Sequence, residues 1–192
     1  MNRKPSEDLL ARNGYINYEE CGKCGGYCCK NSPCGFLPGD FIDVGTRNRD
    51  RGGIMARRIA QKLISREAIL SQAPVVGGGK VLFARMRGIK DDPKAIFTKD
   101  DLTKIRTKES LGNRCIALGK DRCQAEPKPS VGAIARPGKT REECSMGVDT
   151  SILKNICGWT KEDLDWSTTK NQEAVRQAME LAKLSTSVKS QI

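Results

Sequence analysis

The chain has 192 residues, of which 38% are hydrophobic, 5% aromatic and 30% charged. It is long enough for one domain with a modest core, and it lacks the run of about 18 apolar residues that a membrane span needs. The net charge of +11 favours an anionic partner, either nucleic acid or an acidic protein surface, and we expect no membrane partner.

The N-terminal residues carry charge but no apolar run follows them, which argues against a secretory signal. Two early carboxylates, Glu7 and Asp8, argue against a transit peptide. Residues 5–12 are expected to form a short helix that Gly14 ends. Without an export signal we expect the protein to be cytoplasmic, where its cysteines stay reduced.

Cysteine gives the clearest functional signal, because the chain has nine cysteines and no histidine. In a reducing compartment, clustered cysteines indicate metal ligands or redox groups sooner than disulfides. Cys21 and Cys24 have the spacing with which two thiolates reach one ion across a tight turn. Further candidate ligands follow in a segment rich in glycine and proline, which suits loops around a central atom: Cys28, Cys29 and Cys34.

Three later cysteines are also candidate ligands, namely Cys115, Cys123 and Cys144. Their spacings match no tight chelating loop, so they either complete one centre with the N-terminal cysteines or, together with Cys157, close a second zinc site. We favour the first arrangement, because Gly119 is well placed to turn a hairpin that brings Cys115 and Cys123 to the same end. Cys157 is as readily a small buried packing residue as a ligand.

The absence of histidine limits the chemistry of any site in the chain. A zinc site must be thiolate-rich, and a histidine general base or a Cys–His nucleophile pair is impossible. The expected cofactor is therefore a zinc ion held by thiolates or, alternatively, an iron–sulfur cluster. Catalysis is less well supported than binding, although a metal centre can do redox or Lewis-acid work.

The hydrophobic pattern predicts a helix from Ile54 to Leu70, which Ala73 and Pro74 break. Residues 75–87 then look like two strands around a glycine turn. Residues 98–101 resemble the start of another short helix.

In the C-terminal half, prolines predict loops and extended structure over residues 119–144. Residues 160–163 open a helical turn, and residues 171–184 have the most regular helical spacing of the chain. The last residues, 185–192, are expected to form a frayed tail.

A basic run is the second candidate site, and a glycine pair within it allows close backbone approach to phosphates. No aromatic residues are interleaved for base stacking, so sequence-specific reading of single strands is not expected. The alternative is a solvated helix face. The candidate nucleic-acid residues are Arg47, Arg49, Arg51, Arg57, Arg58, Lys62 and Arg66, with Arg85, Arg87 and Lys90 as an expected extension of that surface.

The pattern Cys21-x2-Cys24-x3-Cys28-Cys29 resembles the signature of the YkgJ-like cysteine-cluster proteins, which are described as zinc- or iron-chelating domains. The similarity covers roughly residues 15–145 and includes Cys34 with Asp40, Val81–Arg87, Arg114-Cys115, Arg122-Cys123 and Arg136-Pro137. One departure is Thr140, which stands where many members have a cysteine after Arg-Pro, so that Cys144 comes later. The resemblance implies chelation and does not imply a reaction.

Together these features predict an α+β fold: a small, irregular, metal-stabilised domain with short strands and a C-terminal helix. We expect an N-terminal extension over 1–14, a cysteine-cluster domain over 15–158 and a helical segment over 159–192. The predicted function is that of a metal-binding accessory factor with a protein partner or place in a large assembly. The alternatives are a basic nucleic-acid or ribonucleoprotein-binding subunit with structural zinc, and an iron–sulfur redox or protein-modification accessory enzyme.

Overall fold

The computed structural model describes residues 33–42, 50–75, 77–101, 113–119, 154–155 and 158–189. The predicted helix over residues 5–12 and nearly all of the predicted loop over 119–144 lie outside these ranges. The elements are, in chain order, η1 (Pro38–Phe41), α4 (Arg51–Ile64), β1 (Ala68–Pro74), β2 (Lys80–Met86), β3 (Phe97–Asp101), α8 (Lys161–Leu164) and α9 (Thr169–Lys189). The short strands and the α-helices among the described residues confirm the predicted α+β class.

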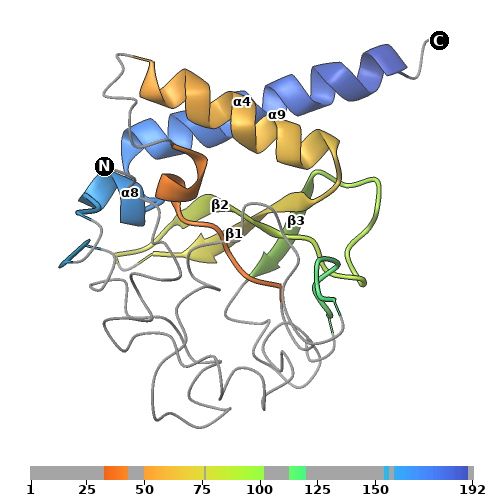
Figure 1. The fold of residues 1–192 in the computed structure, drawn as a ribbon, viewed down its shortest axis with the longest axis horizontal. Helices are drawn as coiled ribbons and strands as arrows, with labels where there is room; N and C mark the ends of the chain where they lie inside the picture. The colour runs from red at the N-terminus through yellow and green to blue at the C-terminus, as the bar shows by residue number, and fades with distance from the viewer. Residues whose placement is uncertain are drawn as a thin grey trace, which may run out of the picture.

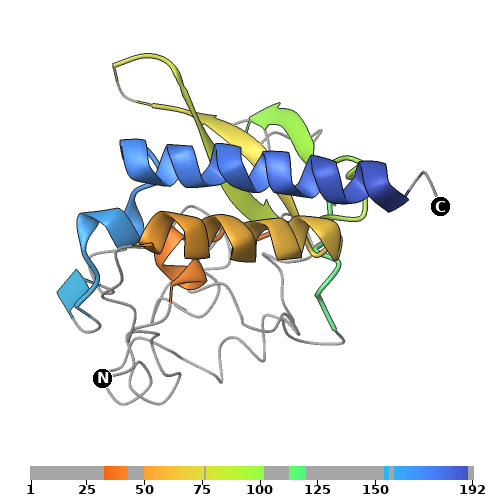
Figure 2. The same cartoon turned by 90° about the horizontal axis from the view of Figure 1, so that it is seen from above.

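A three-stranded sheet in the order β2-β1-β3 forms the centre of the structure. β1 and β2 are antiparallel, with Ala68 opposite Met86 and Pro74 opposite Lys80, whereas β1 and β3 are parallel. Helices α4 and α9 lie together over one side of this sheet (Figure 1). Seen from above, they run side by side, and the C-terminal end of α9 continues beyond α4 (Figure 2).

Helix α4 begins where Asp50 accepts a hydrogen bond from the Gly53 N–H at 3.2 Å, as an N-cap does. Arg66 ends the helical region, because its φ of 63° is left-handed and is costly for a residue with a Cβ. The predicted helix from Ile54 to Leu70 is therefore wrong in its last part, where the chain has already entered β1.

The predicted glycine turn and the strand after it are confirmed, but the predicted position of the first strand is wrong: that strand is β1, which runs from Ala68 to Pro74 and ends before residue 75. Gly77, Gly78 and Gly79 have φ values of 93°, 95° and 90°, which only glycine adopts readily, and the turn projects past α9 (Figure 2). The predicted helix start at residues 98–101 is wrong. The chain is β3 there, because it pairs alongside β1, where Leu70 N–H donates to the Ile96 carbonyl at 2.9 Å.

The predicted helical turn at residues 160–163 is confirmed as α8, where the Thr160 N–H and hydroxyl both donate to Asp163 at 2.8 Å. The predicted helix over 171–184 is confirmed within α9, which runs on to Lys189, so residues 185–189 are helical and the expected tail is shorter. No helix in the described ranges is long and apolar enough to cross a membrane.

One hydrophobic core joins the two long helices, the sheet and the aromatic residues around η1. α9 contributes mainly small side chains, Ala174, Ala178 and Ala182, which let it approach α4 closely. From α4 the buried side chains are Met55, Ala56, Ile59, Ala60 and Leu63, which recur at helical spacing.

Candidate metal-binding site

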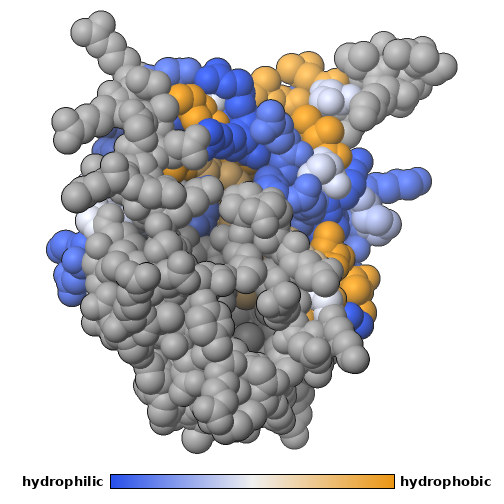
Figure 3. Space-filling view, viewed as in Figure 1, coloured by the Kyte–Doolittle hydropathy of each residue, from blue (hydrophilic) through white to orange (hydrophobic). Residues whose placement is uncertain are grey.

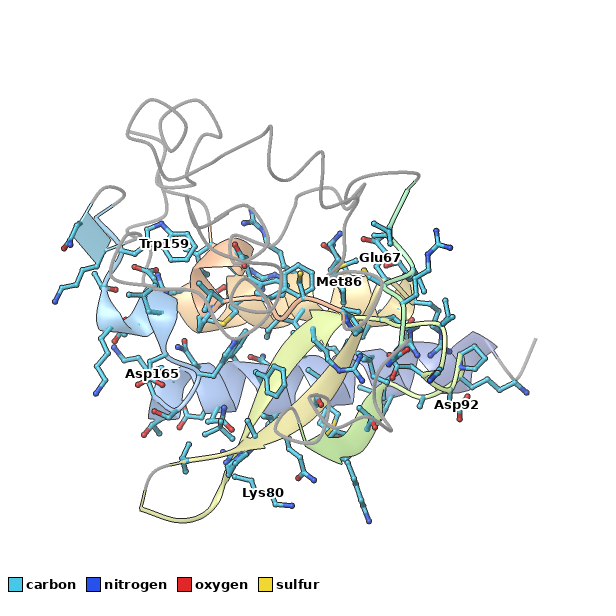
Figure 4. The ribbon with its side chains drawn as sticks, turned by 90° about the horizontal axis from the view of Figure 1, so that it is seen from below. Glu67, Lys80, Met86, Asp92, Trp159 and Asp165 are labelled. Carbon is cyan, nitrogen blue, oxygen red and sulfur yellow. The ribbon has the colours of Figure 1, made fainter. Side chains whose placement is uncertain are left out.

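Two cysteine-bearing segments lie close to the end of β2: the Cys34 segment pairs with the edge of β2 that faces away from β1, and the Cys115 segment pairs with the residues directly after β2. Met86 N–H donates to the Cys34 carbonyl at 2.8 Å, which anchors the first segment. The next residue, Arg87, accepts at its carbonyl from the Ile116 N–H at 3.0 Å, which anchors the segment that carries Cys115. Figure 4 shows Met86 at the end of β2 that is remote from Lys80 and the hairpin turn. Segments from the two cysteine groups therefore meet at one end of one strand.

The remainder of this strand edge is occupied by a side chain. The Gln172 carboxamide accepts from the Leu82 N–H at 3.1 Å and donates to the Leu82 carbonyl at 2.8 Å, as a neighbouring strand would. A third bond, from Gln172 to the Trp166 carbonyl at 2.7 Å, fixes the carboxamide in place. Helix α9 thus holds the same strand edge to which the Cys34 segment is bonded.

Cys34 and Cys115 differ in exposure but belong to the same region of the core. Cys115 is 1% exposed and is part of the hydrophobic cluster, and Cys34 is partly buried and packs against it. Neither forms a disulfide. Their sulfur atoms have the donor chemistry that suits zinc or an iron–sulfur centre.

Arg85 lies opposite Gly35, the residue after Cys34, and its side chain is fully buried. Its guanidinium donates to both oxygens of Asp91, at 2.7 and 2.8 Å. Burial alone would raise the pKa of Asp91, but the hydrogen bonds from Arg85 and from the Gly88 N–H lower it below its usual value. The Arg85 Nε–H is also buried and finds no hydrogen-bond partner among the described residues.

Arg87 is 4% exposed and serves as a buried cross-link between β1 and the loop before β3. Burial lowers the pKa of its guanidinium, as expected for a cation removed from water. In the described part of the chain, no carboxylate oxygen contacts this guanidinium. It donates instead, at 2.6 to 3.1 Å, to the carbonyls of Arg66, Ala68, Asp92 and Ala95.

Asn113 connects the buried Arg85–Asp91 pair to the Cys115 segment. Its amide donates to Asp91 at 3.4 Å, and its carbonyl oxygen accepts from the Lys90 N–H at 2.9 Å. Gly88 forms a bridge with Cys115 at this point, and a Cβ there would meet the Asn113 oxygen at 2.0 Å. The backbone around Cys115 is therefore held by specific polar contacts as well as by the core.

Most of the predicted ligands lie outside the described residues: Cys21, Cys24, Cys28, Cys29, Cys123 and Cys144. Within the described ranges, no three or more cysteine, aspartate or glutamate side chains come together as a metal site would require. The described residues thus place two of the predicted ligands, Cys34 and Cys115, and leave the full ligand set a prediction.

The predicted basic surface is partly neutralised within the protein itself. Arg51 donates to Asp163 at 2.7 Å, Arg57 to Asp50 at 3.1 Å, and Lys62 forms an ion pair with Glu67. The side chains of Arg58 and Arg66 donate to the carbonyls of Phe41 and Lys94. Arg47 and Arg49 lie outside the described residues.

The expected extension of that surface through Arg85 and Arg87 is wrong, because both side chains are buried; only Lys90 is exposed. Sequence reasoning treated these arginines as surface residues, which is where arginine usually lies. The sequence does carry one signal of this burial: the two arginines alternate along a strand, and Asp91 and Asp92 follow Arg87 after three intervening residues.

Comparison of the chain with family models, with curated proteins and with solved structures finds no match. The resemblance of its cysteine pattern to the YkgJ-like proteins therefore stays a prediction, and the function must be inferred from the residues themselves.

Proposed function

We propose that this protein binds a metal through clustered cysteines and acts as a binding or accessory factor in the cytoplasm. The proposed metal is zinc, with an iron–sulfur cluster as the alternative. The observation that carries the proposal is that the Cys34 and Cys115 segments, one from each cysteine group, are hydrogen-bonded to the consecutive residues Met86 and Arg87, where β2 ends. This supports a single folded unit in which both groups contribute to one centre.

The cysteine spacing also supports a metal bound by clustered cysteines. Cys21 and Cys24 are separated by two residues, as in sites where a tight turn presents two thiolates to one ion, and Cys28 and Cys29 follow after three more residues. The resemblance to the YkgJ-like proteins, where it holds, implies chelation as well. A chain with 5% aromatic residues also gains from a metal that adds stability to a modest core.

An accessory role with a protein partner is supported by apolar side chains exposed beside the site. Ile89 is 62% exposed and Ile116 is 45% exposed, and they flank the bridge between Gly88 and Cys115. In the view of Figure 3, hydrophobic side chains of the described part reach the surface in separate patches among hydrophilic ones. Nucleic-acid binding has less support, because Arg51, Arg57 and Lys62 already have carboxylate partners.

Metal analysis of anaerobically purified protein tests the proposal. We expect bound zinc in a colourless protein, or iron with charge-transfer absorption in a brown one. Cys24→Ser should lower the metal stoichiometry, because it removes one of the two thiolates with the tightest chelating spacing. Protein that carries no metal, or equal stoichiometry in the wild type, Cys21→Ser and Cys24→Ser, would remove the proposal.

A further inference from the structure

We infer that Ile89 and Ile116 form a docking surface for an acidic segment of a partner protein. The isoleucines receive an apolar side chain of that segment, and the basic residues beside them receive the carboxylates that flank it. This role rests on the proposed function, of which it specifies the partner-binding surface, and it does not require the metal centre.

An antiparallel bridge sets the positions of the two isoleucines. Gly88 pairs with Cys115 in this bridge. The Ile89 N–H donates to the Arg114 carbonyl at 2.8 Å, which places these two residues opposite each other. Ile116 lies two positions beyond Arg114, so it is the diagonal neighbour of Ile89, a separation of about 7–8 Å that long side chains span. The two isoleucines are therefore neighbours on one surface.

That surface faces away from the hydrophobic core. Cys115 is 1% exposed, whereas Arg114 and Ile116, on either side of it, are exposed, as expected where successive side chains point to opposite faces. Ile89 is 62% exposed and Ile116 is 45% exposed. Isolated apolar residues on a surface need no explanation, but contiguous ones indicate an interaction site.

The backbone beneath the isoleucines is fixed by polar contacts within the protein. The Gly88 N–H donates to the buried carboxylate of Asp91 at 2.6 Å, and the Lys90 N–H donates to the Asn113 side chain at 2.9 Å. Arg85 in turn holds Asp91 through two bonds, at 2.7 and 2.8 Å. A surface that is ordered before binding loses little conformational entropy when a partner docks, so more of the contact energy appears as affinity.

The exposed charges around the isoleucines are mainly positive. Lys90 follows Ile89 directly, Arg114 lies opposite it, and Lys94 is exposed on the same loop. Asp92 is the exposed carboxylate of this loop, and it accepts a hydrogen bond from the Lys94 N–H at 2.8 Å. Three cations against one carboxylate attract an acidic segment, and the net charge of +11 acts in the same direction.

The combination of apolar and basic residues favours a protein partner over a nucleic acid. Phosphates would engage the cations and leave the isoleucines exposed to water. An acidic segment that carries a leucine or an aromatic side chain covers the isoleucines and pairs with the cations at the same time. This is the usual arrangement of a protein interface, with an apolar anchor at the centre and a polar rim.

Selection of random short peptides displayed on phage, with the full-length protein as the target, tests this surface. We expect enrichment of peptides in which an apolar side chain is flanked by aspartate or glutamate. The Kd of enriched peptides is then measured by fluorescence anisotropy at several salt concentrations. The two isoleucines are exposed, so their serine variants should fold like the wild type, which circular dichroism checks.

Ile89→Ser should weaken peptide binding on the order of tenfold, because it removes most of an apolar contact. The double variant Lys90→Gln and Arg114→Gln should weaken binding and reduce its dependence on salt. Leu184→Ser and Arg176→Gln are the matched controls, because they make the same kinds of change at exposed positions on α9. We expect both controls to bind like the wild type.

Weakened binding in the isoleucine variants and in the double variant, with both controls unchanged, supports the inference. It is overturned by a selection that enriches no peptide, by enriched peptides without acidic residues, or by binding that neither Ile89→Ser nor Ile116→Ser weakens. Self-association of the wild type that Ile116→Ser abolishes would instead assign the surface to a second copy of the chain. Binding of labelled RNA or DNA that only the double variant loses would assign it to a nucleic acid.

Metal content, measured on the same samples, separates this surface from the metal site. Wild-type protein that carries no metal but selects acidic peptides would support the docking surface and remove the proposed metal site. Metal-loaded protein that selects no peptide would overturn the docking surface and leave the metal site intact.

Discussion

Trp166 donates its indole N–H to the backbone carbonyl of Phe36 at 2.8 Å, although the two residues are 130 positions apart. The Phe41 ring lies between the two aromatic side chains, 5.1 Å from Phe36 and 6.1 Å from Trp166 between ring centroids. Phe36 follows Cys34 by two residues and is itself paired with β2. The C-terminal helical part therefore helps to fix the Cys34 segment on the strand.

Replacing Trp166 with phenylalanine should lower the free energy of unfolding by about 1–3 kcal/mol, because the Phe36 carbonyl loses its buried donor and the smaller ring leaves space. Urea denaturation measures the change. Leu184→Gln, at a position that is 65% exposed, is the control and should stay within about 0.5 kcal/mol of the wild type. A variant as stable as the control would mean that the bond to Phe36 is dispensable.

Two adjacent glycines in the first turn of α4 should respond differently to alanine. At Gly52 a Cβ meets nothing within 4 Å, so Gly52→Ala should raise the free energy of unfolding by about 0.5–1 kcal/mol through helix propensity. At Gly53 the Cβ would come within 2.2 Å of the Asp50 carboxylate and displace the N-cap. We expect Gly53→Ala to be less stable than Gly52→Ala by about 1 kcal/mol in thermal or urea unfolding. Equal stabilities would show that the cap contributes little.

Asp163 should make the fold sensitive to acid. Burial alone would raise the pKa of this carboxyl, but hydrogen bonds from Thr160 and Arg51 lower it below its usual value. A carboxyl with a lowered pKa contributes stability above its unfolded-state pKa, and this contribution is lost as the pH falls through the folded-state pKa. At pH 6, Asp163→Asn should therefore be less stable than the wild type. On acidification to about pH 3, it should lose less stability than the wild type does. The exposed Glu173→Gln is the control, and a pH dependence for Asp163→Asn that matches this control and the wild type would contradict the assignment.

The sequence predicted correctly those elements whose structure depends on residues that are close together in the chain. The glycine turn at 77–79, the Thr160 cap and the helix of α9 each follow from residues close together in the sequence. The end of α4 was missed because Ala68, Ile69 and Leu70 suit either a helix or a strand, and only their pairing with β2 decides between the two. β3 was missed for the same reason, since its partner β1 is distant in sequence.

The candidate site was predictable to a similar degree. Cysteine spacing is a property of the sequence, so Cys34 and Cys115 were named as ligands without coordinates. That their segments pair with Arg85 and with Gly88, on either side of the end of β2, depends on the strand register, which spacing alone does not determine. The burial of Arg85 likewise depends on its ion pair with Asp91, which lies in the loop after β2. The net charge of the sequence does not reveal this pairing.

Removing the metal should destabilise the part of the fold that depends on the cysteine segments. Structural zinc sites contribute roughly 10–16 kcal/mol, which equals or exceeds the stability of a typical domain, so we expect a chelator to lower the melting temperature and unfold much of the chain. The near-ultraviolet circular dichroism of Trp166 should change early, because its ring contacts the segment after Cys34. The far-ultraviolet helix signal should fall less at first, because α4 and α9 pack directly on each other through their own apolar side chains. Adding back zinc anaerobically should restore both signals, whereas chelated protein that keeps its melting temperature would show that the metal is peripheral to the fold.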